Sequence, residues 1–304
     1  MTPRRPPQLA DSGFREALLR DIRRDARAPA APAKRAAKRG ADVHALELCL
    51  FDLHIGKYAW GEESGEDYDT EVAERRARAA TLDLLGQARN VQLDCIILPI
   101  GNDLLHYDNM EGTTTAGTAQ DRDTRFQRMF RRARALMAWM IRECARHAPV
   151  RVVIVPGNHD TLAAFTLGEV LAAEFARDPR VTFENSPRKR KYVAYGRNLI
   201  VYAHGHAEPH RKLPEIVAAE EPRLWAAATT REVHLGHFHR SKVTEPVYVE
   251  DLPGCTVRVL RSLSGTDAWH SSMGFVGNMC GAEAFLWRKR GGLRANFFHQ
   301  VAAQ

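Results

Sequence analysis

The sequence predicts an α/β fold in which strands and helices form separate layers. Short runs rich in leucine and β-branched residues alternate along the chain with longer segments of helical periodicity. After about residue 242, strand-like runs follow one another with little helix between them, which predicts a second sheet. The chain has 304 residues, 44% of them apolar, which is ample material for a core.

The predicted elements follow in order along the chain. We expect early strands at "LELCLF" (46–51), "DCIILPI" (94–100), "VRVVIV" (150–155), "NLIVYA" (198–203) and "REVHL" (231–235). We expect helices at 68–89, 121–147 and 161–177, and later strands at 243–250, 255–263, 282–287 and 294–301. The chain therefore divides into a basic N-terminal arm, residues 1–40, and one domain, residues 41–304, whose second-sheet strands lie mainly within 242–304.

The formal net charge of +7 belongs to the arm. Residues 1–40 contain eleven basic and four acidic residues, whereas the rest of the chain contains 33 of each. Within the arm, "FREALLRDIRRDAR" (14–27) has a helical stripe and "APAAPAKRAAKRGA" (28–41) is typical of a linker. Such an arm either contacts nucleic acid phosphates or is a solvated tail, and both interpretations stay open.

The composition also bears on location. Five scattered cysteines without CxxC spacing argue against a disulfide framework and a cysteine zinc site, and they fit a reducing cytoplasm. No apolar run approaches the ~20 residues that a membrane span needs. The N-terminal stretch lacks the apolar region of a secretory signal. We therefore expect a cytoplasmic protein without a membrane partner, and a homodimer is compatible with the sequence.

Polar clusters follow five of the predicted strands. They are Asp52-Leu-His54, Gly101-Asn102-Asp103 with His106, Gly157-Asn158-His159-Asp160, His204-Gly-His206 and Gly236-His237-Phe-His239. In an open α/β sheet the carboxyl ends of the strands meet at one crevice, where ligands bind. A lone histidine is more often structural, but five clusters in order are rich in ligands for divalent metals. The sequence therefore predicts a metal site at this edge.

The ordered series DLH, GND, GNHD, a downstream histidine and GHFH resembles the calcineurin-like metallophosphoesterase superfamily. The series runs from Asp52 to His239, which is most of the chain. The resemblance implies a four-layer αββα sandwich of two mixed β-sheets flanked by helices. The spacing of "DLLH", from Asp103 to His106, is similar to that of the DNA-repair exonuclease branch, and the loop that follows is similar to those of phage-type metallophosphoesterases.

The resemblance also implies ligands for two divalent metal ions. Asp52, His54 and His239 would bind one ion, and Asn158, His204 and His237 would bind the other. The family's bridging aspartate is Asp103 rather than Asn102, because a ligand shared by two dications needs an ionised carboxylate; Asn102 then extends the turn. By resemblance the ions are Mn²⁺, and the mixture of oxygen and nitrogen ligands also permits Fe, Zn or Ni.

Charge counting supports phosphoester chemistry at such a site. Two dications and two carboxylates leave about +2, which attracts a phosphate group. A water bridging the ions would be acidified and attack phosphorus in line. His159 is then the family's catalytic histidine, acting on the leaving oxygen. Asp160 would hold the imidazole of His159 or cap the following helix, and His206 would support the ligands or simply be exposed.

Substrate features are less specific. His106 either lies beside the phosphodiester, as in the exonuclease branch, or is a turn residue. The segment 106–125 would line the substrate groove, fold as a lid or form an ordinary surface loop. The basic segments 187–192 and 210–212 would contact nucleic acid or face solvent. Trp269 and His270 would stack on a base, or the tryptophan would be buried.

We therefore expect a dinuclear metal-dependent phosphodiesterase, a hydrolase acting on phosphoester bonds, with DNA as the favoured substrate and a nuclease as the favoured activity. One alternative is a small-molecule phosphatase or cyclic-nucleotide phosphodiesterase. Another, from a different class, is a non-catalytic binding scaffold. The scaffold is disfavoured because no ligand of the implied set is missing from the sequence.

Overall fold

The computed structural model of the chain describes residues 16, 19–20, 43–237, 249–272 and 279–302, and it contains two mixed β-sheets. The first sheet has the strand order β11-β10-β1-β2-β3-β4. Its parallel strands are β1 (His44–Cys49), β2 (Leu93–Gly101), β3 (Val150–Val155) and β4 (Val181–Glu184). Because these strands are parallel, the loops that follow them begin at the same edge of the sheet.

The second sheet has the order β5-β6-β7-β9-β8. Its strands are β5 (Lys191–Tyr195), β6 (Asn198–Ala203), β7 (Thr230–Leu235), β8 (Val249–Leu252) and β9 (Cys255–Val259). The central strands β6, β7 and β9 are parallel, whereas β5 and β8 pair antiparallel at the two edges. The loops after β6 and β7 therefore also share one edge.

The strands of the second sheet differ from those expected. Of the strands after residue 242, only β8 and β9 join it, and its centre is formed by β6 and β7 from before residue 242. The last two strands, β10 (Gly281–Arg288) and β11 (Leu293–Gln300), belong to the first sheet, where β10 pairs antiparallel with the whole of β1. Alternating strands and helices predict parallel pairing, but the pattern does not specify in which of two sheets a strand lies.

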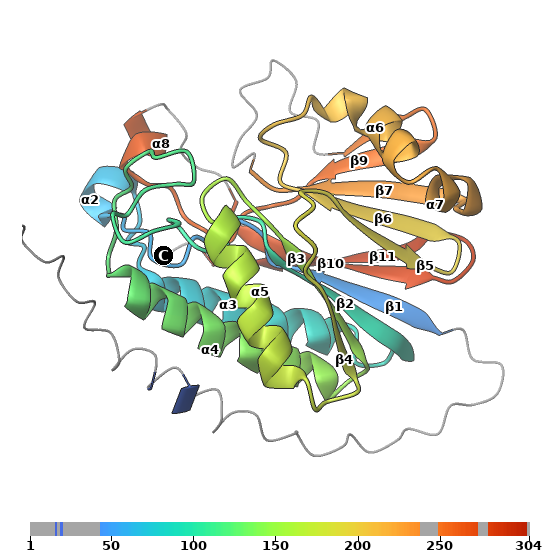
Figure 1. The fold of residues 1–304 in the computed structure, drawn as a ribbon, viewed down its shortest axis with the longest axis horizontal. Coiled ribbons are helices and arrows are strands. Elements are labelled where there is room, and N and C mark those ends of the chain that lie inside the picture. Colours follow the sequence, from blue (N-terminus) through green and yellow to red (C-terminus); the bar gives the residue numbers. More distant parts are fainter. Residues whose placement is uncertain (1–15, 17–18, 21–42, 238–248, 273–278, 303–304) are drawn as a thin grey trace, which may run out of the picture.

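Helices cover the outer face of each sheet (Figure 1). The first sheet carries α3 (Thr70–Gln87), α4 (Phe126–Ala145) and α5 (Thr161–Phe175), close to the predicted helices. The second sheet carries α6 (Leu213–Glu220) and α7 (Pro222–Ala227), preceded by the 3₁₀ helix η1 (His210–Lys212). The expected four-layer αββα sandwich is confirmed. Two short helices, α2 (Gly61–Ser64) and α8 (Ala268–Ser272), contact each other near the strand ends.

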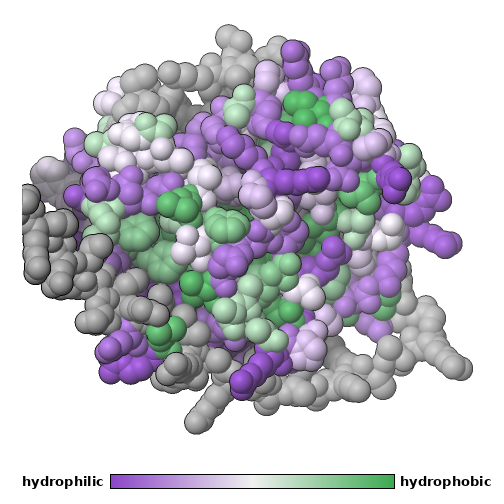
Figure 2. All heavy atoms as spheres, in the orientation of Figure 1, coloured by the Kyte–Doolittle hydropathy of each residue, from purple (hydrophilic) through white to green (hydrophobic). Residues whose placement is uncertain are grey.

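The core has three parts, one for each junction between layers. One lies between the three long helices and the first sheet, a second between the two sheets, and a third under α6 and α7. On the face that carries α4 and α5, hydrophobic side chains are scattered among hydrophilic ones (Figure 2). Single exposed apolar residues of this kind are normal for a folded domain. Among the described residues, no helix has the length and apolarity required to cross a bilayer.

Candidate metal centre

The loops after five strands converge at one edge of the sandwich. Asp52 and His54 follow β1, Asn102 and Asp103 follow β2, Asn158 and His159 follow β3, His204 follows β6, and His237 follows β7. Backbone hydrogen bonds tie the first two loops together: the amide of Asp52 donates to Asn102 O at 3.0 Å, and the amide of His54 donates to Asp103 O at 3.0 Å. His239 lies outside the described residues, as does its loop, 238–248.

The backbone is strained where these side chains lie. Among the described residues, five that are not glycine have a positive φ: Asp52, His54, Asn102, Asp103 and His237, between 47° and 65°. Every one of them belongs to the predicted polar clusters. A non-glycine residue in this region costs free energy, and such residues concentrate at functional sites where the surrounding fold holds them in place.

Two glycines of the motifs allow this close approach. A Cβ on Gly157 would lie 1.9 Å from Oδ1 of Asp103, and a Cβ on Gly236 would lie 2.6 Å from Oδ2 of Asp52. Any side chain at either position would displace a carboxylate. The glycines before "NHD" and "HFH" therefore belong to the construction of the site.

Asp103 lies at the centre of the cluster. Its buried Oδ2 is 3.0 Å from Nε2 of His204 and 4.0 Å from the Nε2 atoms of His54 and His159, yet it meets the geometry of a hydrogen bond with no described residue. Its Oδ1 accepts the backbone N–H of His159 at 2.8 Å. Burial alone would raise the pKa of Asp103, but the neighbouring imidazoles outweigh burial and hold that pKa well below its usual value. Asp103 is therefore an ionised carboxylate facing several imidazole nitrogens.

Asn102 orients His204. Its side-chain Oδ1 accepts a hydrogen bond from Nδ1 of His204, which directs Nε2 of that ring at the centre. Nε2 then lies 2.7 Å from Oδ1 of Asn158, 3.0 Å from Oδ2 of Asp103 and 3.1 Å from Nδ1 of His237. Asn102 therefore does more than extend the turn, and only the position of His204 across the crevice reveals this role.

Positive charge is required where these atoms meet. With the proton of His204 on Nδ1, its Nε2 presents a lone pair to the lone pairs of two oxygens. When the ring is protonated, an N–H at Nε2 takes the place of the lone pair and can donate to these oxygens. Burial alone would lower the pKa of His204, but the carboxylate of Asp103 outweighs burial and raises that pKa above its usual value. A metal ion would satisfy the same atoms without that proton.

Asp52 and His237 complete the second side of the cluster. The backbone N–H of His237 donates to both carboxylate oxygens of Asp52, each at 3.1 Å. Burial and the nearby charge of Asp103 raise the pKa of Asp52 to about 7, and burial together with His204 lowers the pKa of His237 to about 4. Both shifts favour the neutral forms of Asp52 and His237, and a bound cation would favour the ionised carboxylate beside a neutral imidazole.

Three imidazoles lie together beside Asp103. Nδ1 of His106 is 3.2 Å from Nδ1 of His54, and the rings of His106 and His159 are stacked with centroids 5.3 Å apart. His159 is 19% exposed, so a substrate can reach it, and its Nδ1 is 2.8 Å from the backbone O of His106. Burial and His159 lower the pKa of His106 well below its usual value. The structure therefore brings His106 into the centre rather than leaving it on a turn surface.

Asp160 has neither of the two roles expected for its side chain. It is the N-cap residue of α5 by position, but its carboxylate makes no capping hydrogen bond. None of the hydrogen bonds that the described residues make joins it to the imidazole of His159. Instead its oxygens accept the backbone N–H groups of Leu105 and Gly157, both at 3.0 Å. Asp160 thus joins the GNHD loop to the GND loop through hydrogen bonds with the backbone of both loops.

The cap of α5 comes from the loop after β2. Asp108 accepts the backbone N–H groups of Leu162 at 3.2 Å and Ala163 at 2.7 Å, and its Oδ2 also accepts Oγ1 of Thr115 at 2.7 Å. Sequence reasoning missed this residue, since the cap and the helix are separated by more than 50 positions. The only local signal was an aspartate in a segment rich in threonine.

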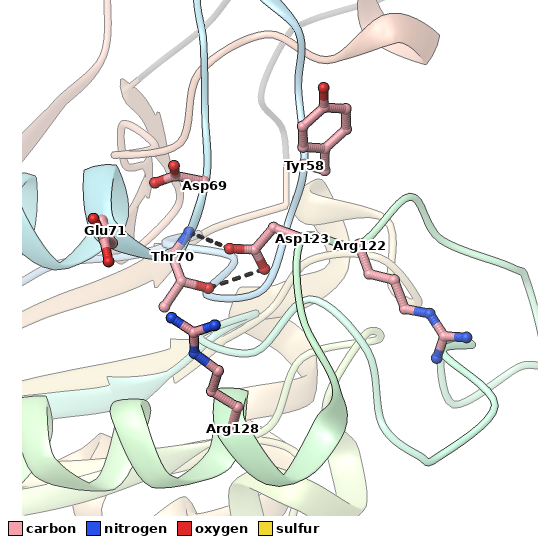
Figure 3. A pocket seen from close by; sticks show the side chains of 7 residues that line it. All are labelled: Tyr58, Asp69, Thr70, Glu71, Arg122, Asp123 and Arg128. Atoms are coloured by element: carbon pink, nitrogen blue, oxygen red, sulfur yellow. Dashed lines mark hydrogen bonds between the residues drawn. The ribbon is translucent and has the colours of Figure 1, made fainter.

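The segment 106–125 is held near its middle and near its C-terminal end. Its C-terminal part is anchored by Asp123, whose carboxylate accepts the backbone N–H of Thr70 at 2.8 Å and its Oγ1 at 3.0 Å, as Figure 3 shows. This anchor borders a surface hollow of about 380 Å³ that Tyr58 and Arg128 also line. Near its middle, the backbone N–H of Thr115 donates to Asn158 O. The segment therefore packs against the centre as an ordered wall.

The described residues form several groups of potential metal ligands, and two of these groups include Asp103. Asp52, His54 and Asp103 have ligand atoms within 4.8 Å of one another, and so do Asp103, His204 and His237. His54, His106 and His159 form a third such group. The unbonded Oδ2 of Asp103, together with oxygen and imidazole donors, fits divalent transition metals. The side chains of Trp269 and His270 lie outside the described residues.

Comparison with known proteins adds little to this picture. No protein-family model matches the chain, and no curated protein matches it in sequence. A solved structure, that of Vps29 from Chaetomium thermophilum, is similar with a TM-score of 0.34 and 13% identity, over 84% of this chain and 96% of that chain. At that level of similarity the chemistry has to be argued from the side chains alone.

Proposed function

We propose that the protein is a dinuclear metal-dependent phosphodiesterase of the calcineurin-like type. One observation supports this most directly: Oδ2 of Asp103 is buried, ionised and without a hydrogen bond while three imidazole Nε2 atoms lie within 4.0 Å. Two donor groups share this residue, as a carboxylate between two cations requires. In this proposal Asp52 and His54 bind one ion together with His239, and Asn158, His204 and His237 bind the other.

Bound divalent ions, Mn²⁺ by our proposal, supply an activated water and neutralise charge on the phosphate. The residues of the chain supply position and a proton. The carbonyl of His106 accepts Nδ1–H of His159, and this bond leaves Nε2 of His159 on the side of Asp103. From there a protonated His159 donates its Nε2 proton to the leaving oxygen as the phosphorus–oxygen bond breaks. Asn102 keeps His204 in the tautomer whose Nε2 faces the centre.

Within this reaction class we propose a polynucleotide, DNA first, as the substrate. The support is the position of His106, whose ring stacks on His159 beside the proposed reacting atoms. Comparing turnover of single-stranded DNA, cyclic nucleotides and aryl monoesters tests the substrate class. Faster turnover of a cyclic nucleotide or a monoester than of DNA would favour a small-molecule enzyme.

Two variants test the metal centre itself. Asp103→Asn removes the shared charge, and we expect about a thousandfold loss of activity on bis(p-nitrophenyl) phosphate, since several kcal/mol of charge stabilisation are lost. Asn102→Ala removes only the orientation of His204, so we expect ~10–100-fold weaker metal affinity and recovery of activity at saturating Mn²⁺.

Elemental analysis of each purified variant gives a readout that does not depend on turnover. Wild-type protein should retain metal, and Asp103→Asn should not. A wild type that binds no divalent metal, or an Asp103→Asn variant with full activity, would contradict the proposal.

A further inference from the structure

His54 and His106 meet through the same ring nitrogen. Nδ1 of His54 is 3.2 Å from Nδ1 of His106, and the two ring planes are at an angle of 80°. Both residues are buried, with exposed fractions of 3% and 5%. Two imidazole nitrogens form a hydrogen bond only when one carries a proton and the other does not. The contact therefore requires that one ring donates and the other accepts.

The other nitrogen of His54 determines the direction of this bond. Its Nε2 faces the candidate metal centre, 4.0 Å from Oδ2 of Asp103, which leaves room for a cation between two ligand bonds of about 2 Å each. A neutral imidazole that gives the lone pair of Nε2 to a metal carries its proton on Nδ1. His54 is then the donor, and Nδ1 of His106 is the acceptor.

The backbone holds the two rings side by side. The amide of Ile55 donates to Leu104 O at 2.8 Å, and the amide of His106 donates to Ile55 O at 3.0 Å. On its other side, the carbonyl of His106 accepts Nδ1–H of His159 at 2.8 Å. His106 thus lies between two imidazoles of the centre, and it contacts one with its ring nitrogen and the other with its backbone oxygen.

We infer that His106 is a positioning residue for a metal ligand: its Nδ1 accepts the Nδ1 proton of His54 and so directs Nε2 of His54 at the ion. This inference rests on the proposed dinuclear centre and assigns an orienting partner to one of its ligands. Asn102 has the same relation to His204 at the other ion, so each ion has one imidazole that the GND loop orients. Loss of such a partner typically weakens metal binding ~10–100-fold.

Substitutions at position 106 can separate the nitrogen from the ring. His106→Asn places an acceptor oxygen where Nδ1 lies, His106→Gln places its amide group at the level of Nε2, and His106→Phe keeps an aromatic ring without nitrogen. Calorimetric titration of the metal-free, full-length variants with Mn²⁺ measures the affinity for each ion. We expect His106→Asn to stay within about threefold of wild type, whereas the other two variants bind one of the two ions ~10–100-fold more weakly.

The matched control is His147→Gln, which changes an exposed histidine outside the crevice and should keep both affinities. Unchanged affinity in His106→Gln, or an equal loss in His106→Asn and His106→Gln, would overturn the assignment of His106 and leave the phosphodiesterase proposal in place. If wild-type protein binds no divalent metal, both proposals fail.

Proton positions give a second measurement that does not depend on affinity. In histidine-labelled wild-type protein loaded with diamagnetic Zn²⁺, long-range proton–nitrogen NMR spectra should show the proton of His54 on Nδ1 and that of His106 on Nε2. A proton on Nδ1 of His106 would reverse the direction of the bond, and His106 would then not orient His54 as a ligand.

Discussion

Two clusters of histidine and carboxylate lie in this molecule, and they differ in how their polar atoms are satisfied. The crevice cluster comprises Asp52, Asp103 and the imidazoles around them. The intersheet cluster comprises Glu47 on β1, His234 on β7 and Cys49, sealed between the two sheets with no exposed surface on Glu47 or His234. Each brings three potential ligand atoms within 4.8 Å of one another.

In the intersheet cluster the polar atoms satisfy one another. Oε1 of Glu47 accepts Nδ1 of His234 at 2.7 Å and Sγ of Cys49 at 3.1 Å, and its Oε2 accepts Nε1 of Trp287 at 2.8 Å. Nε2 of His234 is 3.2 Å from Oε2 of Glu232. In the crevice, by contrast, the backbone is strained and a carboxylate oxygen is left without a hydrogen bond.

The contrast shows that residue type alone does not make a ligand site. Between the sheets, the carboxylate of Glu47 pairs with the imidazole of His234 and accepts a hydrogen bond from the thiol of Cys49. We assign a role in fold stability to this cluster. In the crevice, carboxylates and imidazoles lie on strained loops, and lone pairs of oxygen and nitrogen atoms face one another. We assign a role in cation binding to this cluster. Variants in the two clusters should therefore separate stability from metal binding.

The largest effect on folding is expected for Glu47→Gln. This change leaves a charged His234 without its main counter-charge and removes an acceptor for Trp287 or His234, so we expect a loss of about 3–5 kcal/mol in the free energy of unfolding. Urea denaturation measures it, and metal content per folded molecule should not change. Glu74→Gln, which removes a half-buried partner of Arg132 on the surface, should cost less than about 1 kcal/mol. Equal effects of the two variants would contradict the structural role of the intersheet cluster.

The two clusters should also respond oppositely to pH. Burial alone would lower the pKa of His234, but Glu47 and Glu232 raise it to about 9. The folded state therefore binds an extra proton between pH 6.5 and 9, so this stabilisation is complete below pH 6.5 and is lost as the pH rises through 9. The difference in unfolding free energy between wild type and His234→Gln should shrink by about 3 kcal/mol over that range. A difference that stays constant would show that His234 is not charged in the folded protein.

In the crevice, stabilisation by Mn²⁺ should instead grow between pH 6 and 8. Asp52, with a pKa of about 7, and His204, with a raised pKa, must release protons before a metal binds. The same urea titrations with and without Mn²⁺ measure this increment, which should be unchanged in His234→Gln.

The crevice could be predicted from sequence because its residues follow strands in parallel order. Because β1, β2 and β3 are parallel, their carboxyl ends share one edge of the sheet. The motifs DLH, GND and GNHD directly follow these strands and therefore lie at that edge. The intersheet cluster could not be predicted in this way. Glu47 and His234 sit inside apolar strand runs 187 positions apart, and no local pattern says that β1 and β7 face each other across the sandwich.

The same limit explains the details that sequence reasoning missed within the site. Asn102 was interpreted as a turn residue because its partner, His204, lies 102 positions away on the other sheet. Asp160 was expected to hold His159 or cap α5, yet Asp108 supplies the cap and the carbonyl of His106 orients the imidazole. In each case the spacing placed the residue at the correct edge, and only packing between loops decided which donor met which acceptor.

The smallest effect, and the most direct test of the contrast, is expected for Asp52→Asn. Because burial and Asp103 raise the pKa of Asp52 to about 7, its charge is costly in metal-free protein at pH 8. Asparagine removes that charge and can still accept the N–H of His237, so we expect the metal-free protein to gain about 2 kcal/mol in unfolding free energy while losing its stabilisation by Mn²⁺. Asp178→Asn is the matched control: Asp178 has a pKa lowered by its hydrogen bonds with Arg180, so the variant should lose stability and keep the Mn²⁺ response. Destabilisation of metal-free protein by Asp52→Asn, with the Mn²⁺ increment intact, would mean that Asp52 serves the fold as Glu47 does rather than a metal.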